Sequence, residues 1–151
     1  MVTLQNVTRE NWVACTRLSL HEHQVGNLAS NVATIAEAKF EVHHQLRSIY
    51  KGDKLVGMLA YCQETEPEDT ELYWIFRLMI GKEHQGKGFA HDAMKLAVLE
   101  IVKQGGKKIR TMHKPGNTAA SKLYAKLGFF VIGTLDDGDT LLEYASDLKM
   151  P

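Results

Sequence analysis

One apolar run constrains the fold of this chain more than any other feature. Residues 72–80 read LYWIFRLMI, with no proline and a single charged residue. Such a run is typical of a central β-strand that is buried on both faces. It is followed at once by the glycine-containing stretch GKEHQGKGFAH (residues 81–91) and by a helical pattern over residues 89–104. A strand, a glycine loop and a helix in this order indicate an α/β protein.

The rest of the chain extends this pattern to the order β-α-α-β-β-β-α-β-α-β-β. We expect a mixed, mostly antiparallel sheet of six to seven strands with about four helices. Residues 64–71 (ETEPEDTE) read as a polar loop, and Trp12, Cys15 and Leu18 as one apolar helix face. The predicted strands are residues 3–7, 46–51, 54–62, 72–80, 107–113, 129–135 and 140–145, and the predicted helices are residues 12–21, 35–40, 89–104 and 117–127.

Length and composition narrow the class of protein. The 151 residues predict one domain spanning residues 1–151. No apolar run approaches the roughly 18–20 residues of a membrane span, and the first residues lack the pattern of a signal peptide. Cys15 and Cys62 form no metal-binding or redox spacing, so we expect reduced core cysteines, no metal site and a cytoplasmic protein.

Charge is spread unevenly although the formal net charge is zero. Residues 81–126 hold 10 Lys and Arg against 3 Asp and Glu, while both flanking segments are acidic. The basic middle predicts an anionic ligand, and the acidic stretches 64–71 and 136–139 could attract a cationic one. Because the flanks are acidic, we do not expect nucleic acid as a partner.

The glycine loop has two readings. Gly81-x-x-x-x-Gly86-Lys87 resembles a triphosphate-binding loop, but that motif needs a Ser or Thr where this chain has Gly88. The alternative, Gln85-x-x-Gly88-x-Ala90, is a cradle in which backbone N–H groups at a helix N-terminus hold a pyrophosphate. Lys87 adds a positive charge there. An ordinary strand-to-helix turn would also use such glycines.

A second motif decides between these readings. HQGKGFA (residues 84–90) and NTAASKLYAKLGF (residues 117–129) together resemble the GCN5-related N-acetyltransferase (GNAT) family, in the right order and after the right kind of strand. The stretches NWVACTRLSLHEHQ, SNVATIAEAKF, IYKGDKLVGMLAY and YWIFRLMI are more loosely similar to the bacterial spermine/spermidine acetyltransferases of that family.

The resemblance implies acetyl-CoA as co-substrate, bound in a V-shaped split between the strand ending at Ile80 and the strand at 107–113. It implies no metal. Asn117 would lie near the pantetheine arm, although it also reads as a helix N-cap, and Lys126 would reach the phosphates unless it is simply a solvated lysine. The cofactor-binding residues implied or predicted are Leu78, Met79, Ile80, Gln85, Gly86, Lys87, Gly88, Phe89, Ala90, Asn117 and Lys126.

The resemblance also assigns the chemistry. Tyr124 matches the general acid of the family, although a tyrosine on an apolar helix face is also typical of a core. The glutamate that several members carry nine residues before the loop glutamine is Phe76 here. Alternation puts Trp74 and Phe76 on one face, either as an aromatic wall for an alkylammonium or as packed core. Glu22, Glu71 or a chain of waters could accept the proton of the amine.

The expected activity is direct acetyl transfer to a primary amine, with spermine or spermidine as the acceptor implied by the resemblance. Another small amine, or a protein lysine or N-terminus, keeps the same chemistry. A non-catalytic acyl-CoA-binding module is an alternative of another class. A homodimer is an expectation from the exposed strand edges and from the family.

Overall fold

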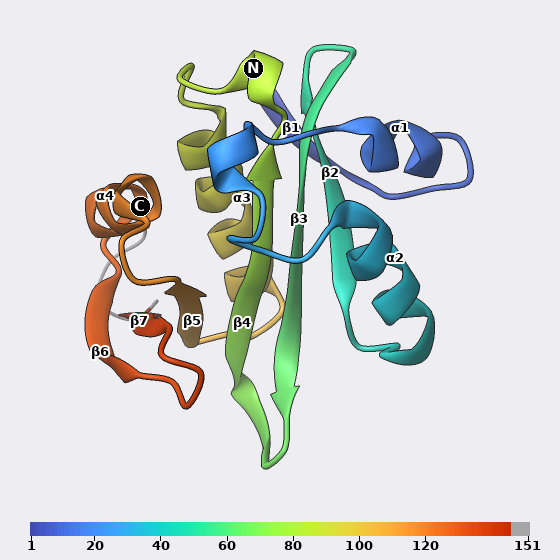
Figure 1. The fold of residues 1–151 in the computed structure, drawn as a ribbon. Helices are drawn as coiled ribbons and strands as arrows, with labels where there is room; N and C mark the ends of the chain where they lie inside the picture. Colours follow the sequence, from blue (N-terminus) through green and yellow to red (C-terminus); the bar gives the residue numbers. More distant parts are fainter. Residues whose placement is uncertain (146–151) are drawn as a thin grey trace.

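The computed structural model describes residues 1–145 as one seven-stranded sheet with four α-helices (Figure 1). This confirms the predicted order of elements and the mixed fold class. The elements are β1 (Val2–Asn6), α1 (Trp12–Arg17), the 3-10 turn η1 (Glu22–Gln24), α2 (Asn31–Phe40), β2 (Gln45–Lys51), β3 (Lys54–Thr65), β4 (Glu68–Ile80), the 3-10 turn η2 (Lys82–His84), α3 (Phe89–Lys103), β5 (Lys108–His113), α4 (Thr118–Leu127), β6 (Phe130–Thr134) and β7 (Thr140–Ala145). Residues 146–151 of the predicted domain lie outside the described part.

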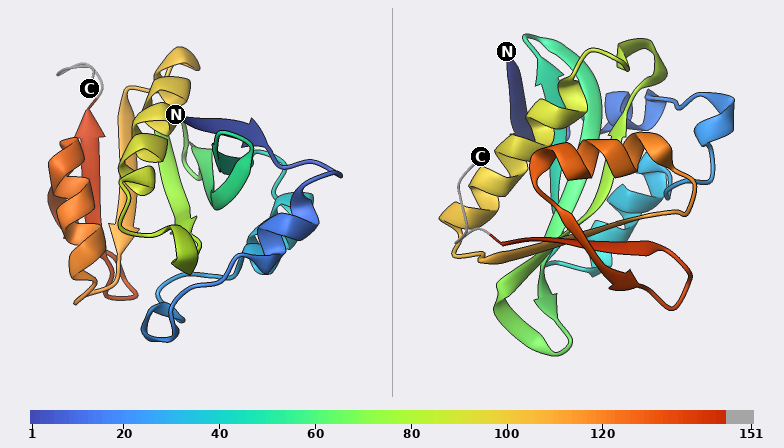
Figure 2. Two further views of the ribbon diagram at one scale, coloured as in Figure 1. Left: turned by 90° about the horizontal axis from the view of Figure 1, so that it is seen from above. Right: turned by 90° about the vertical axis from the view of Figure 1, so that its left-hand side faces the viewer.

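The strands follow the order β1-β2-β3-β4-β5-β7-β6, and every neighbouring pair is antiparallel except β4 with β5. The helices cover opposite faces, with α3 on one side and α1 and α2 on the other (Figure 2). The apolar stripe of α3, which includes Met94 and Ile101, packs on Tyr73 and Ile75 of β4 to form the core. One face of the central strand β4 is therefore covered by α3.

The parallel pairing of β4 with β5 is short. It runs only from Leu72–Lys108 to Trp74–Arg110, although β4 continues to Ile80 and β5 to His113. Just beyond the last pair, the register of β4 against β3 slips by one residue, so that Phe76 has no partner on β3. Such a bulge bends a strand. The two strands therefore diverge, which is the predicted V-shaped split.

Several predicted boundaries were wrong. The polar residues 64–71 are not a loop, because β3 and β4 stay paired as far as Thr65 and Glu68. Backbone pairing needs no apolar side chains where both faces of a hairpin are solvated. The first helix stops at Arg17, and Trp12 is 45% exposed while Cys15 is fully buried. The second helix starts four residues early because the Ser30 hydroxyl accepts a hydrogen bond from the Ala33 N–H at 3.0 Å.

The burial of β4 also differs from the expectation. Tyr73 and Ile75 are buried against α3, whereas Trp74, Phe76 and Leu78 are only partly covered. The strand therefore keeps one face in the core and leaves the other partly open. Among residues 1–145, no helix has the length and hydropathy needed to cross a membrane.

Candidate active site

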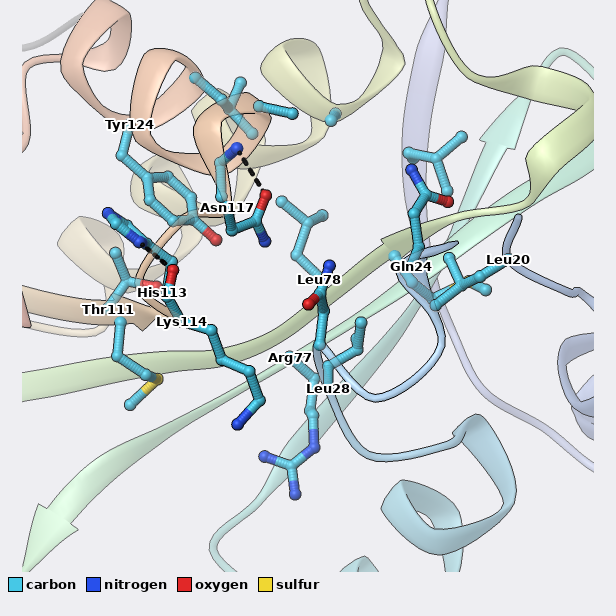
Figure 3. Close-up of a pocket in the computed structure, with 18 of the residues that line it drawn as sticks. Leu20, Gln24, Leu28, Arg77, Leu78, Thr111, His113, Lys114, Asn117 and Tyr124 are labelled. Carbon is cyan, nitrogen blue, oxygen red and sulfur yellow. Dashed lines mark hydrogen bonds between the residues drawn. The ribbon is translucent and has the colours of Figure 1, made fainter. Parts of the chain in front are cut away.

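The split between β4 and β5 opens into a cleft with a volume of about 1190 Å³. This exceeds the roughly 300–1,000 Å³ of an ordinary small-molecule pocket, so there is room for a long ligand or for two. Figure 3 shows Leu78 of β4 in the middle, Gln24 and Leu20 on one side, and Tyr124 with His113 on the other. The predicted residues that line the cleft are Phe76, Leu78, Met79, Ile80, Gln85, Gly86, Gly88, Phe89, Ala90, Asn117 and Tyr124.

The exposed edge of β4 supplies the floor of the cleft. Beyond Trp74 this edge has no strand partner, so an extended ligand can add to it as a further strand would. Some of its carbonyl groups are already used inside the protein. The Ile75 carbonyl accepts a hydrogen bond from the Thr111 hydroxyl at 2.8 Å, and the Ile80 carbonyl accepts one from Gln85 Nε2 at 2.9 Å. The segment between them, at Leu78 and Met79, is left for a ligand.

The glycine loop presents open backbone at one end of the cleft. Gly86 and Gly88 have φ values of +77° and +82°, a left-handed conformation that favours glycine. A Cβ at either position would meet nothing within 4 Å, so the space in front of the loop is free. Gly88 is also the N-cap of α3, and no side chain caps this helix. The N–H groups of its first turn are therefore available to an anion, which the positive end of the helix dipole would attract.

Gln85 has a role that the motif alone does not reveal. Its side-chain amide forms a reciprocal pair with Gln24 of η1, with both N–H···O distances at 2.9 Å. Together with the bond to Ile80, this fixes the start of the loop against the segment that precedes α2. Gln85 thus contributes to the cleft by positioning its rim.

Tyr124 lies on α4 and is only 7% exposed, with its side chain directed into the cleft (Figure 3). Burial raises its pKa above the ordinary tyrosine value, and the neighbouring Thr111 hydroxyl offsets part of this rise. The phenol is therefore neutral at physiological pH and can donate a proton. The His113 ring stacks on it at a centroid distance of 6.3 Å.

Asn117 is the N-cap of α4 and also lines the cleft. Its side-chain oxygen accepts a hydrogen bond from the Ala120 N–H at 3.2 Å and so caps α4. The side chain also lines the cleft close to Tyr124 (Figure 3). The cap uses the amide oxygen, so the amide nitrogen is available to a ligand.

The two aromatic residues predicted to contact an alkylammonium, Trp74 and Phe76, each already have an arginine of this protein over the ring. The Arg110 guanidinium lies 5.7 Å from the centre of the Trp74 ring, and the Arg77 guanidinium lies 5.1 Å from that of Phe76. Phe76 lines the cleft, whereas Trp74 does not. A bound alkylammonium would have to share or displace these contacts.

Besides Trp74, the structure leaves four other predicted residues off the cleft wall. Lys87 is exposed between two lining glycines, and Lys126 is exposed on α4. Glu22 is exposed in η1. Glu71 lies near the paired end of β4 and forms an ion pair with Lys107 at 3.1 Å. Flexible lysines can still reach phosphates at the rim, but neither glutamate is placed beside Tyr124.

Sequence reasoning missed several polar residues of the cleft. His113 is the last residue of β5 and Lys114 comes directly after it, and the Thr111 hydroxyl bridges the two diverging strands. Asp137 and Asp139, from the acidic turn that was noted in the sequence, line the cleft, and Asp139 lies 4.0 Å from the Lys114 ammonium. The signal that could have found His113 is its place at the end of the strand before the second motif.

Comparison with known proteins decides the family. The sequence model described as the acetyltransferase (GNAT) family matches residues 8–129, which is most of the chain. This protein belongs to the GNAT family. The match spans the cleft from η1 through α4, so the glycine loop and Tyr124 both lie inside it.

One relative of this GNAT protein is a probable polyamine acetyltransferase. The chain is 28% identical over 141 residues to a probable spermine N(1)-acetyltransferase of Bacillus subtilis subsp. natto (strain BEST195), a match that covers 89% of this chain and 91% of the relative. Among solved structures, the aminoglycoside acetyltransferase AAC(6')-Ib in complex with coenzyme A superposes with a TM-score of 0.81 at 18% identity, covering 97% of this chain and 96% of that one.

A second solved structure is the spermidine N-acetyltransferase of Vibrio cholerae in complex with CoA and spermine. It superposes with a TM-score of 0.78 at 17% identity, covering 97% of this chain and 96% of that one. At such identities the two structures establish the fold, and their acceptors, an aminoglycoside and a polyamine, belong to those proteins.

Proposed function

We propose that this GNAT protein is an acetyl-CoA-dependent N-acetyltransferase that transfers the acetyl group directly to a primary amine. One observation carries the proposal. A buried, neutral Tyr124, the uncapped N-terminus of α3 and the edge of β4 beyond Trp74 border the same cleft. An anion-binding end, an edge for an extended arm and a proton donor therefore line one cavity.

The residues present fit acetyl-CoA. Gly86 and Gly88 leave the space in front of the loop open, so a pyrophosphate can approach the N–H groups that begin α3. The pantetheine arm would then run along Leu78 and Met79 toward Asn117. Lys87 and Lys126 are proposed as cations at the phosphate end, since both are exposed and free to turn toward it.

The chemistry follows from this placement. The lone pair of a neutral amine attacks the thioester carbonyl, the new C–N bond forms, and the C–S bond breaks. Tyr124 gives its phenolic proton to the departing thiolate, and the nitrogen loses its extra proton to solvent. No acetyl-enzyme is proposed, because burial raises the pKa of both Cys15 and Cys62 to about 11 and neither lines the cleft.

The proposed acceptor is a polyamine such as spermine or spermidine. Asp137 and Asp139 place two carboxylates at the cleft, where an extended polycation would meet them. The similarity to a probable spermine N(1)-acetyltransferase supports the same class. Arg77 and Lys114 also line the cleft, so the acidic turn must bind the distal ammonium groups while the reacting amine arrives neutral.

The route of the amine proton remains a separate proposal. Glu22 and Glu71 are not on the cleft wall, and Phe76 offers no base. Asp137 and Asp139 are the carboxylates of the cleft, and water can link them to the reacting nitrogen. We therefore propose a water chain ending at bulk solvent near this turn as the path of proton loss.

The test is thiol release from acetyl-CoA against a panel of amines, with mass spectrometry of the products. The panel contains spermine, spermidine, putrescine, lysine, an aminoglycoside and a short peptide. Release with spermine or spermidine above all other amines supports the proposal. Release only with the aminoglycoside or the peptide would refute the polyamine acceptor and keep the acetyl transfer.

If no amine of the panel causes thiol release while acetyl-CoA still binds, the result would favour a non-catalytic acyl-CoA-binding module.

A homodimer and a cytoplasmic location are further proposals. The edge strand β6 is exposed along its full length and displays Phe130, Val131 and Ile132, which gives a second copy an apolar surface to cover. Light scattering of the purified protein measures its mass directly.

A further inference from the structure

A cluster of metal-binding side chains lies outside the features discussed so far. His43 and His44, in the turn between α2 and β2, meet Cys62 of β3, and one ligand atom from each lies within 4.8 Å of the others. All three residues are half-buried. The pairing of Gln45 with Tyr61 explains the meeting, because the chain just before Gln45 then runs beside the residue just after Tyr61.

His44 has a buried ring nitrogen without a hydrogen-bond partner in the described part of the chain. Its Nδ1 is buried and makes no hydrogen bond within residues 1–145. The closest carboxylate oxygen, Oε1 of Glu37, is 3.5 Å away and is itself buried without a hydrogen bond. Buried polar atoms in native proteins normally have partners, so an orphaned imidazole nitrogen calls for one.

The surrounding charges favour a cation. Oε1 of Glu37 lies 3.5 Å from His44 Nδ1, and Oε2 of Glu41 lies 3.9 Å from His43 Nδ1. Arg77 opposes them, but its guanidinium is already 3.7 Å from Glu37 and stacked on Phe76. Two carboxylates against one arginine leave a negative surrounding for a divalent ion.

We propose that His43, His44 and Cys62 bind one transition-metal ion, with Zn²⁺ as the preferred metal. Two imidazoles and a thiolate are the donors that Zn²⁺ selects, and hard ions such as Mg²⁺ or Ca²⁺ are poorly served by them. Tetrahedral Zn²⁺ holds its ligand atoms about 3.3–3.8 Å apart. The ligand atoms, which lie within 4.8 Å of one another, therefore need to move closer by about 1.5 Å at most. On binding, Cys62 releases its proton to solvent and the S–Zn bond forms.

The fourth ligand of the metal ion would be a water molecule or Glu37, whose carboxylate lies beside His44. The site also adjoins the cleft. The Phe76 ring, which lines the cleft, lies 4.5 Å from the His44 ring. A bound metal would thus hold the turn before β2 against the bulge of β4.

The experiment uses the full-length protein after chelator treatment and desalting. Zn²⁺ is titrated against a chromophoric chelator, and Co²⁺ is used as a spectroscopic probe, because a thiolate ligand gives a charge-transfer band. We expect one metal per chain, a thiolate–Co²⁺ band, and a higher melting temperature with Zn²⁺. Cys62→Ser should abolish the band and weaken Zn²⁺ binding at least tenfold, and His44→Gln should weaken it similarly.

Two matched controls separate this site from adventitious binding. Cys15→Ser changes the other cysteine, which is buried in α1, and should leave the affinity and the band intact. His21→Gln removes one ring of the stacked His21–His23 pair, whose centroids are 5.7 Å apart, and should also have no effect. If a substituted protein fails to fold, His43→Gln provides the same test.

The proposal is overturned if the protein binds no Zn²⁺, or if Cys62→Ser retains the affinity and the charge-transfer band. Loss of binding in His21→Gln alone would place the metal on the exposed histidine pair and overturn it as well. None of these readouts depends on acetyl transfer.

Discussion

The sharpest prediction concerns the phenol of Tyr124. Tyr124→Phe removes one oxygen from a side chain that is 7% exposed and leaves its volume in α4 almost unchanged. Loss of a general acid typically lowers the rate by 10²–10⁴-fold, which corresponds to about 2.7–5.5 kcal/mol at about 1.36 kcal/mol per factor of ten. We expect kcat to fall within this range, with spermine or the best amine of the panel as acceptor.

Tyr124→Phe should have little effect on the stability of the protein or on its affinity for acetyl-CoA. The Thr111 hydroxyl already donates to the Ile75 carbonyl at 2.8 Å, so it is not left unpaired when the phenol is removed. The free energy of unfolding should therefore change by no more than about 1 kcal/mol. Isothermal titration should give an acetyl-CoA Kd within about twofold of the parent protein, because the anion-binding loop is elsewhere in the cleft.

The pH profile adds a second readout with a fixed sign. Because burial raises the pKa of Tyr124, the phenol stays protonated through neutral pH, and activity that depends on it is lost only as pH rises past the ordinary tyrosine value of about 10. Tyr124→Phe should lack this alkaline decline. The matched control is Tyr73→Phe, another buried tyrosine that does not line the cleft, which should retain kcat.

A fall in kcat of less than about tenfold would contradict the assignment of Tyr124 as the acid. So would a loss of acetyl-CoA affinity as large as the loss of kcat, because the side chain would then act in binding. An equal loss in Tyr73→Phe would show that packing of the core, rather than proton donation, controls the rate.

Three further predictions follow from the geometry. Gly88→Ala should lower the free energy of unfolding by roughly 1 kcal/mol, because φ at this position is +82°. The added methyl group should also weaken the binding of acetyl-CoA by obstructing the pyrophosphate. An unchanged Kd for acetyl-CoA, measured by titration, would contradict the assignment of the loop. Asp137→Asn combined with Asp139→Asn should raise KM for spermine roughly fivefold, make it less salt-dependent and spare kcat, as steady-state kinetics at two salt concentrations would show. Burial and the adjacent Glu100 raise the pKa of Tyr61 to about 12, so this group stabilises the fold fully below pH 10, and on the order of 2 kcal/mol should be lost between about pH 10 and 12. Urea unfolding across that range should show a smaller loss for Tyr61→Phe.

The parts of the site that sequence alone predicted are those set by local rules. The glycine loop and the cap at Asn117 each depend on a few consecutive residues, and the structure places both as expected. A strand-to-helix turn needs positive φ, and a helix start needs a capping oxygen, whatever the remainder of the chain does. The apolar run of β4 was recognisable for the same reason.

The parts that sequence could not give depend on how distant segments pair. Cys62 meets His43 only because β2 pairs with β3 in one particular register, and no spacing along the chain encodes that. Glu71 was a candidate for substrate contact until the pairing of β4 with β5 placed it near Lys107. The acidic stretch at 64–71 looked like a loop because the pairing that extends β3 and β4 leaves no apolar signal.

The bulge at Phe76 links these observations. One unpaired residue in β4 accompanies the divergence from β5 and turns the Phe76 side chain toward His44 and Arg77. A glutamate at this position would find the Arg77 guanidinium beside it and form an ion pair, which lowers the pKa of a carboxylate and weakens it as a base. The absence of the family glutamate is therefore consistent with this local charge. The proton of the amine must leave by another route, and the nearest carboxylates of the cleft are in the turn at Asp137 and Asp139. If the double Asp→Asn substitution lowers kcat as well as raising KM, that turn takes part in proton transfer as well as in binding.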